Sequence, residues 1–426
     1  MMTTPRFTRF ATSHVSLMLL LVGVCLVGCT GRNTAPATIL YRLTFEAGDQ
    51  DLWDALVTAR LPRSPEVKAV LIETTGGRFT PVASQMDPRD ESLLWFTADG
   101  ELPHGSRRDY ILVPADEAPS VTFSNVELFD DGRGGLLAHW GSRNILQYNY
   151  GFRLAEGMDP VQRRNAYIHP VWSPSGAVVT DDFHPDHAHQ RGVWFAWTET
   201  RFRDRQPDFW NLHKQTGRVE FEAFGEQTEG PVFAEFSVRH RHLDVSVPDR
   251  PEVVLEEDWT VRVFRPGLRR PHTFDLTSVQ EVVADAPLEL QQYHYGGLGV
   301  RGARNWTPDK VTFLTSNGQQ RPDADQTRVD WCLMEGSIPP NYAGLLALGH
   351  PDNFRAPQAV RIHPEMPYFS LTPLPLGSFE MRPKEKTIWR YRLIAYDGRM
   401  DSAPARQFWE EYCSPPAAQV ELPSAE

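Results

Sequence analysis

The chain has 426 residues, a length that predicts two domains plus extensions at about 100 to 200 residues per domain. Its hydrophobic content of 41% excludes disorder throughout, and its net charge of -12 provides no field that would attract nucleic acid or anionic lipid. The 30 glycines, 35 prolines, 12 tryptophans and 23 phenylalanines are typical of an all-β protein with many turns.

Residues 1–28 have the pattern of a secretory signal peptide. Arg6 and Arg9 precede an apolar run of 13 residues from Val15 to Val27. That run is shorter than the roughly 20 residues of a spanning helix, but it suits the apolar segment of a signal peptide. It ends at Cys29, and Leu26-Val27-Gly28-Cys29 resembles the bacterial lipobox, which implies cleavage before Cys29 and lipidation of its sulfur. The alternative is an ordinary signal peptide that is cleaved elsewhere.

The residue after Cys29 bears on where such a lipoprotein resides. Thr30 stands where an Asp would retain a lipoprotein in the inner membrane, so the resemblance implies an outer-membrane lipoprotein on the periplasmic or extracellular face. We expect residues 29–37 to form a lipidated tether and no later segment to cross a bilayer. In an oxidising compartment Cys332 and Cys413 either form a disulfide or remain two buried thiols.

Residues 38–118 are predicted to form a small β domain. Short apolar runs alternate with turn residues, which is the pattern of short strands joined by tight turns. The runs are Val70–Ile72, Phe79–Val82, Leu93–Phe96 and Tyr110–Val113. The segment 115–120 is predicted to be a linker.

Residues 120–413 are predicted to form one large antiparallel β domain. Hydrophobic and polar residues alternate with period two in 219–224, 233–239 and 259–264, as expected for strands with one solvated face. The clearest helix follows Ser402, a candidate N-cap, and should pack across a sheet through Phe408 and Tyr412. Residues 414–426 are rich in Pro and Ala and are predicted to be a disordered tail.

Histidines are concentrated in the segment between Arg163 and Trp197. His169, His184, His187 and His189 fall within 21 residues, although the whole chain has only 14 histidines. One interpretation is a divalent metal site at His187 and His189, which would point to one side of a strand. A second is hydrogen bonding and proton transfer to a sugar ring, since histidine has a pKa near 6.5. A third is structural, with the polar groups fixing a loop.

In the sugar interpretation, other residues of the same segment have complementary roles. Arg164 and Arg191 would orient hydroxyl groups or a carboxylate, and Trp194 or Trp197 would stack on the apolar face of a pyranose. In Gln291–Arg301, which includes His294, the paired glycines indicate either close approach of the backbone to a ligand or a structural bulge. Gly349–Arg355, which includes His350, Asp352 and Asn353, is a turn-prone run that could end at a cleft.

These motifs, taken together, resemble a bacterial family labelled methane-oxygenase PmoA-like. The resemblance covers roughly Arg143 to Tyr412 and is carried by five motifs in order: Arg164–Pro170, Asp186–Gly192, Gly296–Arg301, His350–Asn353 and Tyr391–Gly398. The label does not describe the chemistry, because a particulate methane monooxygenase subunit is built from membrane-spanning helices. The resemblance implies a β-supersandwich similar to galactose mutarotase, with the histidine motifs in its concave face and sugars as ligands.

Two positions depart from the family pattern. The family core reads Asp-His-Pro-His-His-Arg-Gly, whereas this chain has Ala188 in place of the proline and Gln190 in place of the third histidine. A ligand role that requires histidine at position 190 is therefore not expected.

The resulting prediction is an all-β lipoprotein in which a small β-sandwich precedes a galactose-mutarotase-like supersandwich that binds and processes a carbohydrate. The predicted catalytic residues are His187, His189, His294 and Asp186. The predicted substrate-binding residues are Arg164, His169, Arg191, Trp194, Arg301, His350, Asp352 and Asn353. No cofactor is expected in this interpretation, whereas the alternative, a metal-dependent oxygenase or hydrolase, would use a divalent metal at His187 and His189. The other alternative is a glycan-binding lipoprotein without catalysis.

Overall fold

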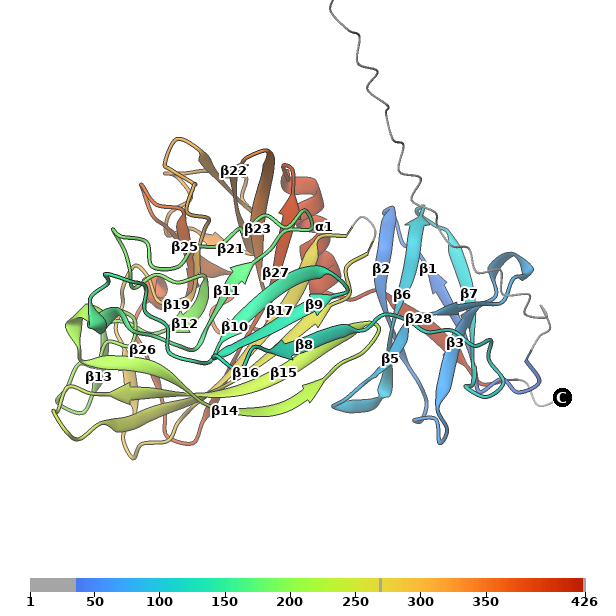
Figure 1. The fold of residues 1–426 in the computed structure, drawn as a ribbon, viewed down its shortest axis with the longest axis horizontal. Coiled ribbons are helices and arrows are strands. Elements are labelled where there is room, and N and C mark those ends of the chain that lie inside the picture. The colour runs from blue at the N-terminus through green and yellow to red at the C-terminus, as the bar shows by residue number, and fades with distance from the viewer. Residues whose placement is uncertain (1–35, 268–269, 424–426) are drawn as a thin grey trace, which may run out of the picture. The chain divides into compact units, whose positions relative to one another are not determined.

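The computed structural model describes residues 36–267 and 270–423, which group into one compact unit. The described chain is almost entirely β, so the prediction of an all-β fold with large antiparallel sheets is confirmed. Four sheets contain all the named strands (Figure 1). The predicted signal peptide, Cys29 and most of the predicted tether lie outside the described residues.

The first sheet has eight strands in the order β4-β3-β7-β1-β28-β2-β6-β5. Their bounds are β1 Tyr41–Glu46, β2 Leu52–Arg60, β3 Ala69–Glu73, β4 Thr80–Val82, β5 Ser84–Asp87, β6 Asp90–Leu102, β7 Arg107–Pro114 and β28 Ala417–Glu421. This sheet has a core of its own, in which Leu43, Val57 and Phe96 are buried. A shared cluster that includes Trp95 and Phe233, whose ring centroids are 6.2 Å apart, joins it to the larger sheets.

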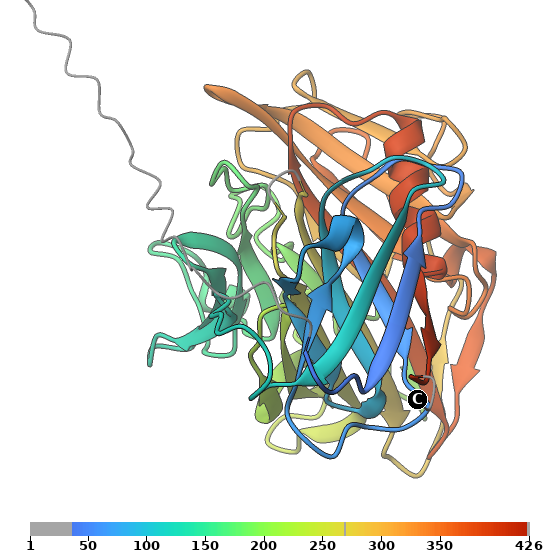
Figure 2. The same ribbon diagram turned by 90° about the vertical axis from the view of Figure 1, so that its right-hand side faces the viewer.

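Strand β28 corrects the prediction of a disordered carboxyl-terminal tail. It lies between β1 and β2, antiparallel to the first through Leu43 and Val420 and parallel to the second through Ala59 and Ala418. Figures 1 and 2 show this red strand alongside the blue strands from the start of the chain. Ala418 is 8% exposed and belongs to the core of the sheet. The segment is ordered because its backbone groups pair on both sides, a long-range effect that local composition does not reveal.

Two large sheets form a sandwich. The nine-stranded sheet has the order β21-β24-β25-β19-β12-β11-β10-β9-β8, and the eight-stranded sheet has the order β14-β15-β16-β17-β27-β23-β22-β20. The nine strands are β8 Val126–Asp130, β9 Gly135–Trp140, β10 Arg143–Asn149, β11 Tyr167–Val171, β12 Val193–Ala196, β19 Gly297–Arg301, β21 Arg328–Val329, β24 Gln358–Ile362 and β25 Tyr368–Thr372. The eight are β14 Gly217–Thr228, β15 Phe233–Asp244, β16 Glu252–Phe264, β17 His272–Val282, β20 Val311–Thr315, β22 Trp331–Ile338, β23 Asn341–Gly349 and β27 Lys386–Asp397.

The two large sheets share one hydrophobic core. Phe195 of β12 packs against Trp389 of β27 with ring centroids 6.0 Å apart, and both side chains are buried. A small third sheet consists of β13 Thr200–Phe202, β18 Leu288–Leu290 and β26 Phe379–Met381. Four short 3-10 helices complete the described elements: η1 Thr75–Gly77, η2 Pro160–Gln162, η3 Leu212–Lys214 and η4 Leu374–Leu376.

Helix α1, Ser402–Cys413, is the single α-helix of the described chain and packs across a sheet as predicted. Its N-cap is Asp401, not Ser402, since the Asp401 carboxylate accepts a hydrogen bond from the amide of Ala403 at 3.1 Å. Tyr412 packs with residues of β22, β23 and β27 on the face of the sheet opposite the shared core. In the described chain no helix has both the length and the apolar character required to traverse a bilayer.

The two remaining cysteines are both free thiols. Cys332 of β22 faces the shared core, whereas Cys413 ends α1 on the other side of that sheet. Of the two possibilities left open by the sequence, pairing is therefore wrong. Cys413 is only half-buried, so the expectation of two buried thiols holds for Cys332 alone.

Removing β28 tests its place in the small sheet. A chain that ends at Ser414 should lose roughly 2–5 kcal/mol of unfolding free energy, because each lost backbone hydrogen bond contributes about 0.5–1.5 kcal/mol and Ala418 leaves the core. Denaturant titration measures the difference. A chain that ends at Glu421 keeps the strand and should match the full chain; equal stability of both truncated chains would contradict the pairing.

Candidate functional site

Three short strands of the nine-stranded sheet position the candidate site. Strand β19 lies between β12 and β25, with Gly299 opposite both Trp194 and Ser370. Arg301 lies opposite Tyr368. Because residues paired across strands lie on the same face, these side chains share one face of the sheet, while Phe195 and its neighbours face the core.

Gly299 lets aromatic rings approach this face closely. A Cβ atom at that position would lie 2.7 Å from atoms of both Trp194 and Trp210, too close for a real contact. The two indole rings are 4.7 Å apart, and Trp210 is 6.1 Å from the ring of Tyr368. The absence of a side chain at 299 therefore allows an aromatic floor to form.

A cavity of about 160 Å³ lies over this floor. It is lined by His187, His189, Gln190, Trp210, Asn211, His294, Tyr295, Arg361, His363 and Tyr368. We call it the histidine cavity. Three of the four predicted catalytic residues, His187, His189 and His294, converge there.

Sequence reasoning missed His363 and Arg361. The ring of His187 is 5.5 Å from that of His189 and 5.6 Å from that of His363. Arg361 is opposite Ser370 on the neighbouring strand, so it shares the face that bears Gly299. Its guanidinium forms an ion pair with Asp325 at 2.7 Å. The alternating pattern of side chains in β24 and β25 was the available sequence signal. It shows which residues share a face, but it places Arg361 at the site only once β25 is known to pair with β19.

The four imidazoles of the histidine cavity are neutral at neutral pH. Burial, helped by the charge of Arg361, lowers the pKa of His363 to about 4, and burial with neighbouring His187 lowers that of His189 to about 3. Burial also lowers the pKa of His187, with Arg301 adding to the effect, and that of His294, with Arg361 adding to it. Neutral imidazoles can each donate and accept a hydrogen bond.

Hydrogen bonds fix the role of one ring and leave three available. Nδ1 of His363 accepts the backbone N–H groups of Glu365 and Met366, both at 3.1 Å, which places its proton on Nε2. Within the described chain, no hydrogen bond reaches the rings of His187, His189 or His294, and Nδ1 of His187 is buried without a partner. These three rings are free to bind a ligand.

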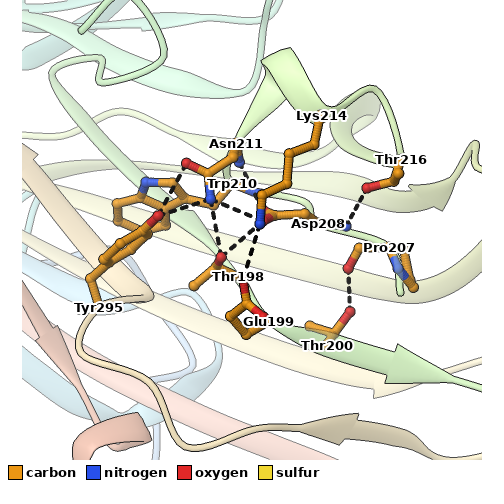
Figure 3. A network of polar contacts seen from close by, with 10 residues as sticks. All are labelled: Thr198, Glu199, Thr200, Pro207, Asp208, Trp210, Asn211, Lys214, Thr216 and Tyr295. Atoms are coloured by element: carbon orange, nitrogen blue, oxygen red, sulfur yellow. Dashed lines mark hydrogen bonds and ion pairs between the residues drawn. The ribbon is translucent and has the colours of Figure 1, made fainter. Parts of the chain in front are cut away.

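A polar network surrounds Asn211 and Tyr295, two of the residues that line the histidine cavity (Figure 3). Asn211 donates to the hydroxyl of Tyr295 at 2.9 Å and to the carboxylate of Asp208 at 2.9 Å. Lys214 forms an ion pair with Asp208 at 2.8 Å. Burial alone would raise the pKa of Asp208, but the bonds from Lys214 and Asn211 outweigh it and the pKa is lowered. Burial raises the pKa of Tyr295 to about 12, so its hydroxyl stays protonated.

Two predicted substrate-binding residues, Arg191 and Arg301, lie beneath the loop that carries His187 and His189. Neither arginine lines the histidine cavity. Arg191 is fully buried, donates to the carbonyl of Ala188 at 2.7 Å and lies 3.6 Å from the ring centroid of Phe183. Arg301 donates to Gln190 at 2.9 Å. Substrate contact by these arginines stays a prediction; in the structure their nitrogens hold the loop that carries His187 and His189. Gln190, which stands where the family pattern has a third histidine, therefore has a structural role as the acceptor of the Arg301 hydrogen bond.

Other predicted residues of this region also lie outside the histidine cavity. Asp186 has a side chain that is 69% exposed, and Trp194 is fully buried as part of the floor. His169 bonds to Thr180 at 2.9 Å, and burial together with the charge of Arg304 lowers its pKa to about 4. Arg164 lines a different cavity.

The predicted motif at 350–353 is a structural turn. Asn353 bonds to both backbone groups of Arg390 in β27, at 2.7 and 2.8 Å. The ring of His350 packs on Tyr412 of α1 at 5.3 Å, and the side chain of Asp352 is 70% exposed. The structure does not bring these residues to the histidine cavity: Asn353 joins the turn to β27 and the His350 ring packs against α1.

Metal ligation at His187 and His189 finds no complete ligand set. Structural and catalytic zinc sites use three or four side-chain ligands. Among the described residues no group of three or more His, Cys, Asp or Glu side chains is arranged to hold a metal ion. The metal alternative therefore lacks support from the side chains around the histidine cavity.

Comparison with known families places most of these residues in one sequence family. Residues 137–410, more than half of the chain, match the model of a family of unknown function, DUF6807. The chain belongs to this family. Every residue that lines the histidine cavity falls within the DUF6807 region. No curated protein matches the sequence.

The neutral buried histidines predict a loss of stability in acid. Their native pKa values lie below the unfolded value of 6.5, so the unfolded chain binds protons first as the pH falls and the native state loses stability from pH 6.5 towards pH 4. The melting temperature should therefore be lower at pH 5 than at pH 7. His189→Gln should make this difference smaller, whereas His104→Gln, at a side chain that is 74% exposed, should leave it unchanged. An unaltered pH dependence in His189→Gln would contradict the burial of a neutral ring.

Proposed function

We propose that this DUF6807 protein binds a carbohydrate or sugar derivative in the histidine cavity and processes it by acid–base chemistry. The observation that carries the proposal is the set of three neutral imidazoles, His187, His189 and His294, that have no hydrogen-bond partner in the described chain. Sugar hydroxyls both donate and accept hydrogen bonds, as neutral imidazoles do. Trp210 supplies an apolar wall of the kind on which sugar rings pack.

The size of the cavity favours one sugar unit. Its volume of about 160 Å³ is below the roughly 300–1,000 Å³ typical of small-molecule sites. A single ring, or the end of a longer glycan, suits this space better than an internal stretch of polysaccharide. The galactose-mutarotase-like architecture that the PmoA-like resemblance implies would also suit a sugar ligand.

The lining favours proton transfer over hydrolysis by paired carboxylates. Most glycosidases use two carboxylates, and no Asp or Glu is among the described residues that line the histidine cavity. Epimerisation and elimination instead need a base that removes a proton and a group that stabilises the negative charge left behind. His187 and His294 suit the base, because His189, with a pKa of about 3, accepts a proton less readily.

The remaining polar groups of the cavity suit the complementary roles. Nε2–H of His363 and the guanidinium of Arg361 would stabilise an oxyanion on the sugar. The protonated hydroxyl of Tyr295, held by Asn211, would return a proton. In this scheme a C–H proton of the sugar moves to an imidazole nitrogen, and the negative charge is held on a sugar oxygen. Epimerisation ends when Tyr295 protonates the carbon, whereas elimination ends when the neighbouring C–O bond breaks and Tyr295 protonates the departing oxygen. The imidazolium then passes its proton to the tyrosinate, which restores both groups.

We also propose that the protein acts at the outer membrane, on the periplasmic or extracellular face, with Cys29 as its lipid anchor. The apolar run that ends at Cys29 and the Thr that follows it support this location. Its partner is a carbohydrate-like small molecule or oligosaccharide, and its acidic charge disfavours nucleic acid.

Two sugar probes test the proposed function. Galactose in deuterium oxide reports proton exchange by NMR, and polygalacturonate reports elimination through the absorbance of the unsaturated product. We expect saturable binding of at least one probe and turnover that His187→Gln lowers by about 10²–10⁴-fold, the usual contribution of a general acid or base.

His350→Gln is the matched control, since that ring lies outside the histidine cavity against Tyr412, and it should keep the wild-type rate. Absence of binding and turnover with both probes, or equal losses in the two variants, would contradict the proposal. Saturable binding without turnover would reject the catalytic part and favour the glycan-binding alternative.

A further inference from the structure

A second cavity borders the segment that forms one wall of the histidine cavity. Its volume is about 560 Å³, and it is lined by Phe152, Pro160, Val161, Arg163, Arg164, Leu212, Gln215, Gly217, Arg218, Val219, Glu220 and Val245. We call it the Arg164 cavity. Asn211 lines the histidine cavity, whereas Leu212 and Gln215, which follow it closely, line the Arg164 cavity.

Arg164 is a buried cation without a partner. Its side chain is 1% exposed, and all three guanidinium nitrogens are buried with no hydrogen-bond acceptor in the described structure. No carboxylate of the described residues forms an ion pair with it, although Arg191, the other arginine of this interior, is paired with Asp182. An isolated buried charge is strongly unfavourable, so such a group calls for a counter-charge that the chain does not supply.

The positive charge of the residues that line the Arg164 cavity indicates that the missing partner is an anion. Three arginines but one acidic residue line the Arg164 cavity, and that residue, Glu220, is paired with Arg218 at 2.7 Å. The cavity is therefore positive in a protein whose net charge is -12. A planar guanidinium binds carboxylate and sulfate oxygens through parallel hydrogen bonds.

The Arg164 guanidinium also acts on the histidine cavity. Burial and the neighbouring rings of His187 and His213 lower the pKa of His189, and the Arg164 guanidinium adds to this effect. Burial and the nearby charge of Arg191 lower the pKa of Arg164 itself to about 9, so it remains mostly charged at neutral pH. An anion bound at Arg164 would thus be close enough to influence the imidazole of His189.

We propose that the Arg164 cavity is a second binding site, which takes the carboxylate or sulfate group of an acidic sugar. The sugar part of this inference rests on the proposed function, whereas the anion part rests on Arg164 alone. A chain of sugar units could then place one ring in the histidine cavity and an acidic substituent against Arg164.

Titration calorimetry and melting curves with three probes test the site. The probes are glucose, glucuronate and a sulfated glucose, so the last two distinguish a carboxylate from a sulfate ligand. We expect wild-type protein to bind at least one anionic probe tenfold or more tightly than glucose, and Arg164→Met to lose that preference. Arg60→Met makes the same chemical change at a side chain that is 65% exposed and should keep it.

The melting temperature of Arg164→Met without ligand gives an independent test. Removing an unpaired buried charge should leave the melting temperature of Arg164→Met equal to or above that of wild type. A lower melting temperature, or failure to fold, would mean that the guanidinium already has partners and would overturn the proposal. So would equal affinity for glucose and both anions in wild type.

His187→Gln separates this inference from the proposed function. That variant removes a ring of the histidine cavity but should retain the Arg164-dependent preference for the anion. If it abolishes turnover and keeps the preference, both proposals stand. If no variant shows turnover but the preference persists, the proposed function fails and the anion site is supported.

Discussion

Antiparallel pairing of β12, β19 and β25 is the constraint on which the candidate site depends. It places Trp194, Gly299, Arg301 and Tyr368 on one face of the nine-stranded sheet and turns Phe195 toward the shared core. A shift of the strand register by one residue would exchange the two faces and turn Arg301 toward the shared core. The loops that carry His187, His294 and His363 lead into β12, β19 and β25, respectively, so the same register brings the three histidines together.

Burial then determines the chemistry of these groups. It keeps the imidazoles neutral and available as both donors and acceptors, while Arg191 and Arg301 under the loop provide the positive charge. Buried polar groups in proteins usually have protein partners. Here Nδ1 of His187, which lines the histidine cavity, and all three guanidinium nitrogens of Arg164, which lines the Arg164 cavity, are among the buried atoms without a partner in the described chain. Arg164 is the described residue whose guanidinium has all three nitrogens in this state, which supports a ligand at that position.

Much of the fold was predictable from the sequence because strand periodicity is local. Alternation in 219–224 and 259–264 marked strands that the structure contains as β14 and β16. β28 was missed because five residues at the end of a Pro- and Ala-rich stretch carry little local signal and are ordered by two distant strands. The start of α1 was misplaced by one residue because Asp401 and Ser402 are both good N-caps.

The candidate site was predictable only in part. His187, His189 and His294 were identified because they lie in segments where polar residues, histidines and glycines are concentrated. The same kind of composition also drew attention to His350 and Asn353, which fix a turn. His363 and Arg361 lie in a segment with no unusual composition, and the pairing of β24, β25 and β19 alone brings them to the cavity. Local motifs therefore found one side of the site, and long-range pairing supplied the other.

Nitrogen NMR of the histidine side chains during a sugar titration tests the central claim most directly. We predict that His363 is the Nε2–H tautomer, that the rings of His189 and His363 are neutral at pH 6, and that His187, His189 and His294 shift together with a single saturation curve when galactose or glucuronate is added. His350, against Tyr412, should not shift. Charged rings of His189 or His363 at pH 6, or no coordinated shift with either sugar, would contradict a neutral imidazole cluster that binds carbohydrate.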